Sequence, residues 1–386
     1  MTKVHRQINP ILSKSFFLFG ARGVGKSSWI RTHFANTPHL MWDLLNPELE
    51  DRMSKYPEQF REEIMSKLGT FEWVIIDEIQ KCPKLLNSVH QLISQHNIKF
   101  LLTGSSARRL RQKGVNLLAG RALTQFMFPF TSTELGSNFS LDDALTFGTL
   151  PDVVIEPDVE TRKAYLRSYA LNYLKFEIQM EQWVRKLDPF RKFLAIAAQM
   201  NGKILNYTSI AREVGTDANT IQNYFEILED TLVGYRLQAY HSSVRKQQRQ
   251  APKFYFFDLG VKRALDRTLD VILIPSTSAF GEAFEHFIFL EIYRQCQYKY
   301  PDWELYYLQS KDGAKIDLIL DRPQKTTLLI EIKSKENPSA EDTRHLEHFS
   351  TDFKNSELYL LTRQKQPRKI GNVETLPWKT FLDTIF

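Results

Sequence analysis

Eight residues near the N-terminus have the types and the spacing of a phosphate-binding loop. The segment GARGVGKS, from Gly20 to Ser27, fits G-x-x-x-x-G-K-(S/T) at every fixed position, between an apolar run and a helical pattern. Its glycines let backbone N–H groups wrap around phosphates, and the N-terminus of the following helix adds positive potential. We predict that Lys26 reaches the β- and γ-phosphates of ATP and that Ser27 ligates Mg²⁺. The loop residues predicted to bind the nucleotide are Gly20, Gly23, Gly25, Lys26, Ser27 and Ser28.

Two acids at the end of an apolar run supply the complementary part of such a site. The run WVIIDE, residues 73–78, ends in Asp77 and Glu78. We predict that Asp77 binds Mg²⁺ and that Glu78 is the general base for the attacking water. Another run, FLLTGSS, ends with Thr103 and Ser105, which could sense the γ-phosphate, and we count Thr103 among the nucleotide-binding residues. The alternative for the acids is a strand that ends in two carboxylates by chance.

Phosphoryl transfer also requires a cation at the γ-phosphate, and an arginine finger can be worth roughly 10³ to 10⁵ in rate. We predict Arg121, in LLAGRAL, for this role, with Arg108 and Arg109 as alternatives. Each of these arginines could instead be a surface residue or a nucleic-acid contact. If the finger acts in trans, the protein forms a homo-oligomer.

The C-terminal third contains a second set of chemically capable residues, in KIDLILDRPQKTTLLIEIKSK from Lys315 to Lys335. Two apolar runs flank a polar turn, which predicts a β-hairpin. Glu331 and Lys333 are two residues apart and share one face of a strand, and Asp317 on the partner strand can lie beside them. Acids that converge on Mg²⁺, with a lysine that orients water or stabilises charge, are typical of a metal-dependent nuclease. The other interpretation is that these charges lie on the solvated face of a sheet.

Residues 207–231, YTSIAREVGTDANTIQNYFEILEDT, have the form of a helix, a tight turn and a second helix. Gly215 supplies the backbone freedom of the turn, and Asp217 or Asn219 can cap the second helix. The apolar runs that follow predict the strands of a winged helix. Because the second helix carries no Lys or Arg, we expect no sequence-specific reading of bases from it. The same module could serve only to pack other domains together.

A basic stretch lies between the two predicted wing strands. From Arg236 to Lys253 the chain holds five Lys or Arg and no acid. Clustered positive charge favours phosphate binding by counterion release, whereas a solvated basic loop is the plain alternative. The predicted contacts to the DNA backbone are Arg245, Lys246, Arg249 and Lys253.

The nucleotide-binding residues require a parallel α/β arrangement in the first third of the chain. Short apolar runs alternate there with amphipathic stretches such as 83–95, as in a parallel sheet covered by helices. The predicted strand runs are 16–20, 39–45, 73–78 and 98–104.

Composition excludes some classes of protein. The chain has 386 residues, a formal charge of +6 and a pI near 9.0, which suits several compact units and a basic surface. No apolar run reaches the length of about 18 residues that spans a bilayer, so we expect no membrane segment. The basic N-terminus runs into the glycine loop and not into a cleavage site, so we expect a cytoplasmic protein. Cys82 and Cys296 form no metal-ligand or disulfide pattern.

The motifs LFGARGVGKSS, VIIDEIQKCPKLL, KFLLTGSSARRL and LLAGRAL together resemble a prokaryotic family of AAA+-type P-loop ATPases. In that family the ATPase domain is fused to a winged helix and a C-terminal restriction-endonuclease-like, PD-(D/E)XK, domain of largely unknown function. The resemblance runs nearly the whole chain. It implies an α/β fold class with four parts: a P-loop ATPase domain at 1–135, a helical connector at 136–187, a winged helix at 188–258 and a nuclease-like domain at 259–386.

The resemblance also implies an acid on a helix before the hairpin. Glu285, four residues after Gly281, matches the family's G-x-x-x-E, while Glu282 is an alternative one turn away. The implied metal ligands of the nuclease-like site are then Glu285, Asp317 and Glu331, with Lys333 as the catalytic lysine. Lys315 departs from the family, because an acid commonly stands at that position.

Two functions follow as hypotheses. In the first, an Mg²⁺-dependent ATPase uses ATP binding and hydrolysis to control a DNA-binding, metal-dependent nuclease, in defence or repair. In the second, the chain is an ATP-driven switch whose C-terminal domain is a catalytically inactive module that binds DNA or protein.

Overall fold

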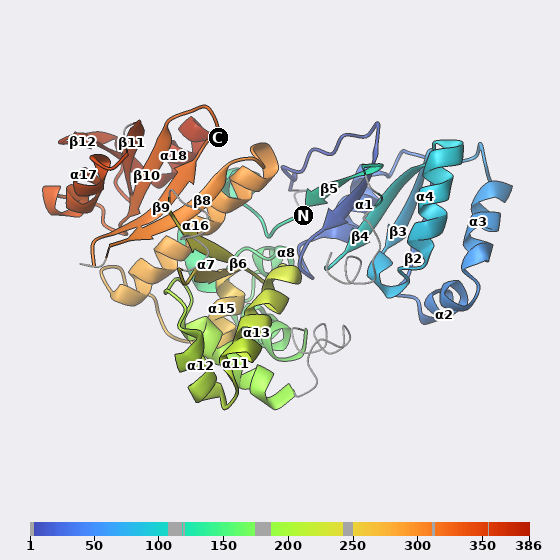
Figure 1. Cartoon of the computed structure of the whole chain (residues 1–386), viewed down its shortest axis with the longest axis horizontal. Coiled ribbons are helices and arrows are strands. Elements are labelled where there is room, and N and C mark those ends of the chain that lie inside the picture. Colours follow the sequence, from blue (N-terminus) through green and yellow to red (C-terminus); the bar gives the residue numbers. More distant parts are fainter. Residues whose placement is uncertain are drawn as a thin grey trace. The chain divides into compact units, whose positions relative to one another are not determined.

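The chain forms two compact units, each with its own sheet. The computed structural model describes residues 4–106, 118, 120–173, 187–241, 250–310, 313–353 and 355–386. Unit 1 comprises residues 1–130, 150–152 and 230–233, and unit 2 comprises 131–149, 153–229 and 234–386 (Figure 1).

The sheet of unit 1 has five strands, all parallel to one another. Their order is β2-β3-β4-β1-β5. The five residues of β1 and of β3 are all buried, as expected for strands covered on both faces. The strands are β1 (Ser15–Phe19), β2 (His39–Asp43), β3 (Trp73–Asp77), β4 (Lys99–Gly104) and β5 (Ala122–Phe126).

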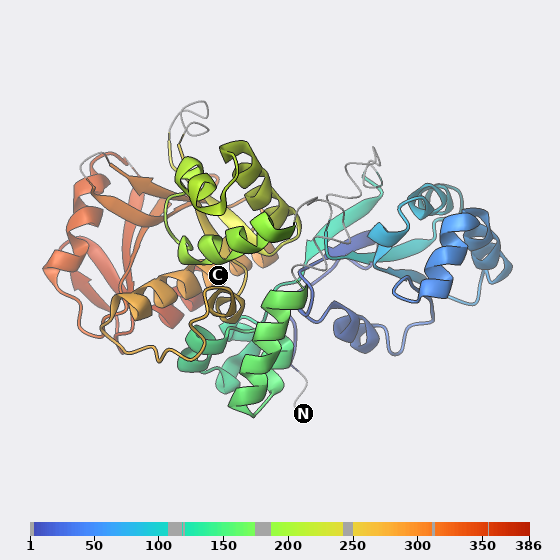
Figure 2. The ribbon, with the colours of Figure 1, turned by 90° about the horizontal axis from the view of Figure 1, so that it is seen from below.

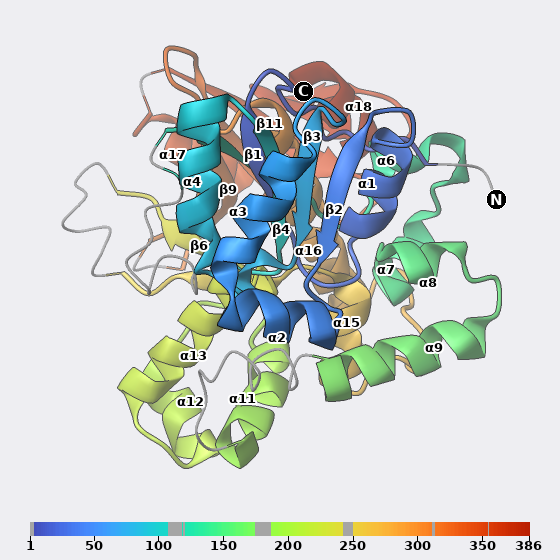
Figure 3. The same cartoon turned by 90° about the vertical axis from the view of Figure 1, so that its right-hand side faces the viewer.

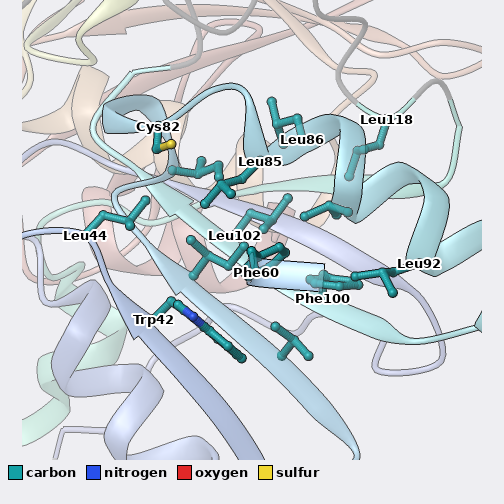
Figure 4. Close-up of a cluster of buried hydrophobic side chains, with 14 of the residues drawn as sticks. Trp42, Leu44, Phe60, Cys82, Leu85, Leu86, Leu92, Phe100, Leu102 and Leu118 are labelled. Carbon is teal, nitrogen blue, oxygen red and sulfur yellow. The ribbon is translucent and has the colours of Figure 1, made fainter. Parts of the chain in front are cut away.

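Helices cover both faces of this sheet (Figure 3). Side chains from α2, α3 and α4 pack on alternate strand residues such as Phe17 and Leu102 in one large apolar core (Figure 4). Helix α1 packs on the other face, where the ring of Phe34, just after it, lies 5.4 Å from that of Trp73. The helices are α1 (Lys26–His33), α2 (Pro47–Lys55), α3 (Pro57–Ser66), the short η1 (Ile79–Lys81) and α4 (Leu85–His96).

Unit 2 contains a mixed sheet of eight strands. The order is β12-β13-β11-β10-β9-β8-β6-β7, with parallel pairs at β13-β11, β11-β10 and β8-β6 and antiparallel pairs elsewhere. The predicted hairpin is present as β9 and β10, with Ile330 opposite Leu318. The strands are β6 (Gly234–Ala239), β7 (Lys253–Phe256), β8 (Glu304–Gln309), β9 (Lys315–Asp321), β10 (Thr327–Ile332), β11 (Ser356–Thr362), β12 (Arg368–Ile370) and β13 (Val373–Pro377).

The largest helix of the chain as described is α16 (Ser278–Lys299), which packs against β10. Most of its residues are buried, and these include the polar His286, Glu291, Arg294 and Gln295 beside the apolar ones. The other helical segments are α6 (Ser132–Leu135), η2 (Gly136–Asn138), α7 (Leu141–Phe147), α8 (Pro151–Ile155), α9 (Val159–Ser168), η3 (Tyr169–Tyr173), α11 (Leu187–Gln199), α12 (Tyr207–Val214), α13 (Ala218–Asp230), α15 (Leu259–Leu265), η4 (Ala340–Thr343), α17 (Arg344–Ser350) and α18 (Trp378–Ile385).

The helices α11, α12 and α13 lie together and precede the antiparallel pair β6 and β7 (Figure 2). Gly215 ends α12 with a φ of 82°, and the carboxylate of Asp217 accepts a hydrogen bond of 2.9 Å from Thr220 N at the start of α13. Asp217 is therefore the cap, and not Asn219. The β6 strand continues from this hairpin into the large sheet by pairing with β8.

The predicted α/β fold class is confirmed, with a parallel sheet at the N-terminus and a separate mixed sheet after it. Among the residues that the structure describes, no helix is both long and apolar enough to cross a membrane.

Candidate functional site

The glycine loop joins the end of β1 to the start of α1. Gly23 and Gly25 have φ angles of 80° and 95°, in the left-handed region that favours glycine. The ammonium of Lys26, on a side chain held below the surface, donates to the Gly20 carbonyl at 2.6 Å and to the Ala21 carbonyl at 3.3 Å. The lysine charge is thus held at the loop itself, while the first N–H groups of α1 have no partner within their helix. Such a loop can hold the phosphates of a nucleotide.

Two hydroxyl groups flank the carboxylate of Asp77 at the end of β3. Ser27 Oγ donates to Asp77 Oδ2 at 3.1 Å. Thr103, buried at the end of β4, donates to the other carboxylate oxygen and accepts a hydrogen bond of 3.0 Å from Glu78 N. Four of the predicted residues, from three segments of unit 1, therefore form one hydrogen-bonded network.

The donor chemistry of this network fits ATP with Mg²⁺. Ser27 and Asp77 present hydroxyl and carboxylate oxygens to one point, and Mg²⁺ in nucleotide sites is usually held by one or two protein oxygens together with phosphates and waters. Lys26 supplies the positive charge that the phosphates require. Ser28 is exposed and accepts a hydrogen bond of 3.4 Å from Arg31, so the described contacts do not join it to the network.

Arg121 lies at the wrong edge of the sheet to act on a phosphate bound by its own chain. It directly precedes β5, and Ala122 pairs with Ser15 at the start of β1, whereas the glycine loop follows Phe19 at the end. At about 3.3 Å per residue, roughly 16 Å of strand separate the two edges. Arg121 instead donates to Ser94 Oγ at 2.9 Å. This position does not suit a finger that acts within one chain, and it leaves a role in trans as a prediction. The alternatives Arg108 and Arg109 lie outside the described residues.

Sequence reasoning missed two residues beside the loop. Arg6 is buried, donates to the Val24 carbonyl at 3.1 Å and to the Phe128 carbonyl, and has its guanidinium 4.6 Å from the centre of the Phe130 ring. Gln80 is buried and donates to the carboxylate of Glu78. The proximity of Gln80 to Glu78 in DEIQ was the only available signal, and nothing in the sequence linked Arg6 to the loop.

In unit 2 the residues of the predicted nuclease-like site come together as ion pairs. Lys315 Nζ lies 3.0 Å from Asp317 Oδ1, and Lys333 Nζ lies 2.6 Å from Glu331 Oε1. Glu285, on α16, accepts from Lys253 at 3.3 Å and from the hydroxyl of Tyr255 at 2.8 Å. The alternative acid, Glu282, is exposed.

Burial makes these charges depend on one another. Asp317 and Glu331 are each 1% exposed, and Asp317 Oδ2 also accepts a hydrogen bond of 3.0 Å from Ile332 N. Burial, followed by the charge of Asp317, raises the pKa of Glu331 to about 7. Burial alone would raise the pKa of Asp317, but the positive charges of Lys315, Lys253 and Lys333 outweigh it and lower that pKa.

The predicted metal ligands Glu285, Asp317 and Glu331 do not form a group that could hold a metal ion. Within the described ranges, no three His, Cys, Asp or Glu side chains form a group that could hold a metal ion. The physical reason is visible in the pairs above: each of the three carboxylates faces a lysine ammonium. Lys315 and Lys253 contribute two of these charges; the sequence placed Lys315 beside Asp317, but it did not place Lys253 at the acids.

The structure also contradicts the prediction that Lys253 contacts the DNA backbone. Its side chain is buried, paired with Glu285 and 5.5 Å from the centre of the Tyr307 ring, so it does not face solvent as a phosphate contact would. Arg245, Lys246 and Arg249 lie outside the described residues.

Comparison with known proteins finds family models that match three parts of the chain. Residues 12–136 match the family model described as AAA domain. Residues 138–271 and 280–381 match two models described as domains of unknown function, DUF8612 and DUF4143. The AAA match and the loop geometry support a P-loop ATPase domain, with nucleotide and usually Mg²⁺ as its ligands.

The relatives that match most of the chain are described as uncharacterized proteins. An uncharacterized protein of Mycobacterium tuberculosis is 24% identical over 306 residues, which cover 79% of this chain and 67% of that protein. An uncharacterized protein of Methanocaldococcus jannaschii is 25% identical over 434 aligned positions, covering 98% of this chain and 87% of that protein. Domain III of the Thermotoga maritima replication initiation protein DnaA aligns at 13% identity and a TM-score of 0.20, over 56% of this chain and 84% of that one, too weak to bear on the fold.

Proposed function

We propose that this chain is an Mg²⁺-dependent ATPase. Its ATP binding and hydrolysis control how unit 2 acts on nucleic acid through its charged cluster, the acids Glu285, Asp317 and Glu331 with the lysines that face them. The observation that carries the ATPase part is the 3.1 Å hydrogen bond from Ser27 to Asp77, beside a glycine loop that holds Lys26. That hydrogen bond supports the proposal, because a hydroxyl and a carboxylate side by side are the protein oxygens that a nucleotide-bound Mg²⁺ takes.

The roles of the residues follow from their positions. The loop N–H groups and Lys26 would bind the phosphates, and Ser27 and Asp77 would hold Mg²⁺, which neutralises charge on the β- and γ-phosphates when bound. Glu78 would take the proton from the attacking water, and Thr103 would orient Asp77 and the backbone of Glu78.

ATP hydrolysis by the purified chain tests this part. We expect turnover that requires Mg²⁺, stops with EDTA and falls by at least about 100-fold in Lys26→Ala, because the charge at the phosphates is lost. Lys67→Ala, which changes an exposed lysine of the same unit, should keep the wild-type rate. Wild-type turnover in Lys26→Ala would rule out the proposed site.

Arg121 fits this proposal only as a residue that acts on a second copy of the chain. Its edge of the sheet is about 16 Å from the loop of its own chain, so a finger role requires a homo-oligomer. Mixing Lys26→Ala with Arg121→Ala should restore part of the turnover that each variant lacks, because mixed assemblies contain sites with both intact residues. No gain on mixing, with both variants inactive and oligomeric, would exclude this role.

For unit 2 we favour the second hypothesis, a catalytically inactive module that binds DNA or protein, and of these two partners we propose nucleic acid. Each buried or half-buried acid of the cluster already faces a lysine, which supports a site that is neutralised by the protein itself. Cleavage remains the competing function, with Glu331 and Lys333 as its central residues.

DNA assays with Mg²⁺, with and without ATP, separate the two. A binding module should bind DNA in a salt-dependent way and leave single-stranded and double-stranded substrates intact. Cleavage that disappears in Glu331→Ala and in Lys333→Ala, with ATP hydrolysis retained, would establish the nuclease instead.

A further inference from the structure

Gln80 lies between an acid that follows β3, Glu78, and a hydroxyl group that follows β4, that of Ser105. It follows β3 by three residues, is 3% exposed, and shares one amide group between two partners. Its Nε2 donates to Glu78 Oε2 and, at 3.1 Å, to Ser105 Oγ just after β4. The chemistry fixes the orientation of this amide, because a carboxylate can only accept and must therefore face the N–H side.

Glu78 has an uncommon backbone conformation. Its φ of 59° lies in the left-handed region, which costs a non-glycine residue about 1 kcal/mol or more and persists only where contacts enforce it. Thr103 holds the backbone through Glu78 N at 3.0 Å. Gln80 holds the carboxylate, so the two ends of this residue are tied separately to the carboxyl end of β4.

The surroundings of Gln80 leave it little freedom. A Cβ at Gly104 would lie 2.7 Å from Gln80 Oε1, so a glycine at the end of β4 is what admits the amide. That oxygen has no hydrogen-bond partner among the residues that the structure describes, although it is buried. The contacts of the group are therefore made through its N–H side, toward Glu78 and Ser105.

We propose that Gln80 is a positioning residue for ATP hydrolysis: it fixes the carboxylate of Glu78 against Ser105, at the edge of the sheet where the phosphate loop begins. This inference rests on the proposed ATPase function and deepens it, by naming what aims the general base. Misplacement of a reacting group by about 1 Å can cost roughly 100-fold in rate, so the loss of this contact should act on turnover and not on nucleotide binding.

Gln80→Met tests the proposal, because it keeps the size of the side chain and removes the donor. We expect kcat to fall about 10- to 100-fold while the dissociation constant for ATP, measured with a fluorescent analogue, changes less than threefold. Gln91→Met, at an exposed glutamine on α4, is the matched control and should leave both values unchanged. A kcat within threefold of wild type in Gln80→Met overturns the proposal.

A mutant cycle separates positioning from a merely structural role. In a Glu78→Gln background the base is already lost, so adding Gln80→Met should cause no further decrease in kcat. An equal decrease in both backgrounds would show that Gln80 acts independently of Glu78. If Gln80→Met does not fold, Ser105→Ala provides the second test, because it removes the other partner of the amide. It should lower kcat by about threefold or more, again at constant ATP affinity. An unchanged kcat in Ser105→Ala would count against the proposal. Absence of turnover in the wild type would instead reject the ATPase function itself.

Discussion

Lys315 Nζ lies 3.0 Å from Asp317 Oδ1, so a lysine holds one of the two most deeply buried carboxylates of the unit 2 cluster. Burial opposes the charge of Lys315, but the carboxylates of Asp317 and Glu285 outweigh it and raise the pKa of the lysine. Asp317 is ionised in return, because its own pKa is lowered. This pair explains how an acid that is 1% exposed can be accommodated without a metal ion.

Removing Lys315 should therefore destabilise unit 2. Loss of one partner of a buried pair costs about 3–5 kcal/mol, but the Lys315 side chain is 41% exposed, so solvent screening reduces the expected loss for Lys315→Ala to about 1–2 kcal/mol. Urea unfolding measures this change. Lys365→Ala, at an exposed lysine of the same unit, should change stability by less than about 0.5 kcal/mol. Equal stabilities of the two variants would contradict the role assigned to the pair.

Reversing the charge of Lys315 should create a demand for a divalent cation. In Lys315→Glu a second carboxylate would lie near Asp317, and the repulsion should lower the unfolding temperature in EDTA. Mn²⁺ at millimolar concentration should restore several degrees, because a ligand that binds only the folded state stabilises it. The wild type should shift by less than about 1 °C under the same conditions. A large Mn²⁺ shift in the wild type would show instead that its lysines do not replace a metal.

Thr103 should be required for turnover through its two hydrogen bonds. Thr103→Val keeps the shape of the side chain but removes the acceptor for Glu78 N and the donor to Asp77, both in a buried setting. We expect kcat for ATP to fall by about tenfold or more. The control is Thr124→Val, at an exposed position on β5, which should have the wild-type rate. Unchanged turnover in Thr103→Val would show that Asp77 and Glu78 are held without it.

The geometry of the candidate nucleotide site was predictable because its residues are specified locally. Buried parallel strands read as short apolar runs, so the predicted run 73–78 agrees with β3 at Trp73–Asp77, and the acids follow at its end. The loop depends on glycines at fixed spacing, and Gly23 and Gly25 do adopt positive φ. Sequence alone therefore assigned Ser27 and Asp77 to one site, and a hydrogen bond joins them in the structure, while their roles toward ATP and Mg²⁺ stay predictions.

The second cluster could be predicted only in part, because its partners come from distant segments. Sequence spacing put Glu331 and Lys333 together, but it could not show that Lys253 turns inward to Glu285 from a strand 32 residues away. The position of Arg121 could not be predicted for a related reason: the direction of β5 decides at which edge of the sheet Arg121 lies, and that direction follows from pairing with β1, not from the residues nearby.

His286 should make unit 2 less stable in mild acid. The ring is buried, its Nε2 contacts the Phe256 carbonyl at 2.6 Å, and burial lowers its pKa from 6.5 to about 3. Because the folded-state pKa is the lower one, the stabilisation is present above pH 6.5 and is lost as pH falls toward 3. Between pH 7 and 5 we expect a loss of about 2 kcal/mol from this residue alone.

The pH dependence of urea unfolding for His286→Gln checks that expectation. Over the same pH interval, the free energy of unfolding of the variant should fall by about 2 kcal/mol less than that of the wild type, even if the variant is less stable at pH 7. His348→Gln changes an exposed histidine in unit 2 and should follow the wild type. If all three proteins show the same slope, the buried histidine does not control the acid sensitivity.

Glu291 should be one of the most sensitive positions of unit 2, because it joins the start of α6 to α16. It is 0% exposed, accepts from Ser132 N at 2.9 Å and from the Ser132 hydroxyl, and lies 3.7 Å from Arg294 Nη1. Glu291→Ala removes the acceptor for a buried N–H and the carboxylate beside a buried guanidinium, which should cost about 3–5 kcal/mol. Glu291→Gln keeps an acceptor for Ser132 and should cost less.

Glu282→Ala, on the same helix but exposed, isolates the effect of burial and should be nearly neutral in urea unfolding. A loss in Glu282→Ala as large as that in Glu291→Ala would mean that α16 is sensitive to any change, and not to the loss of this network.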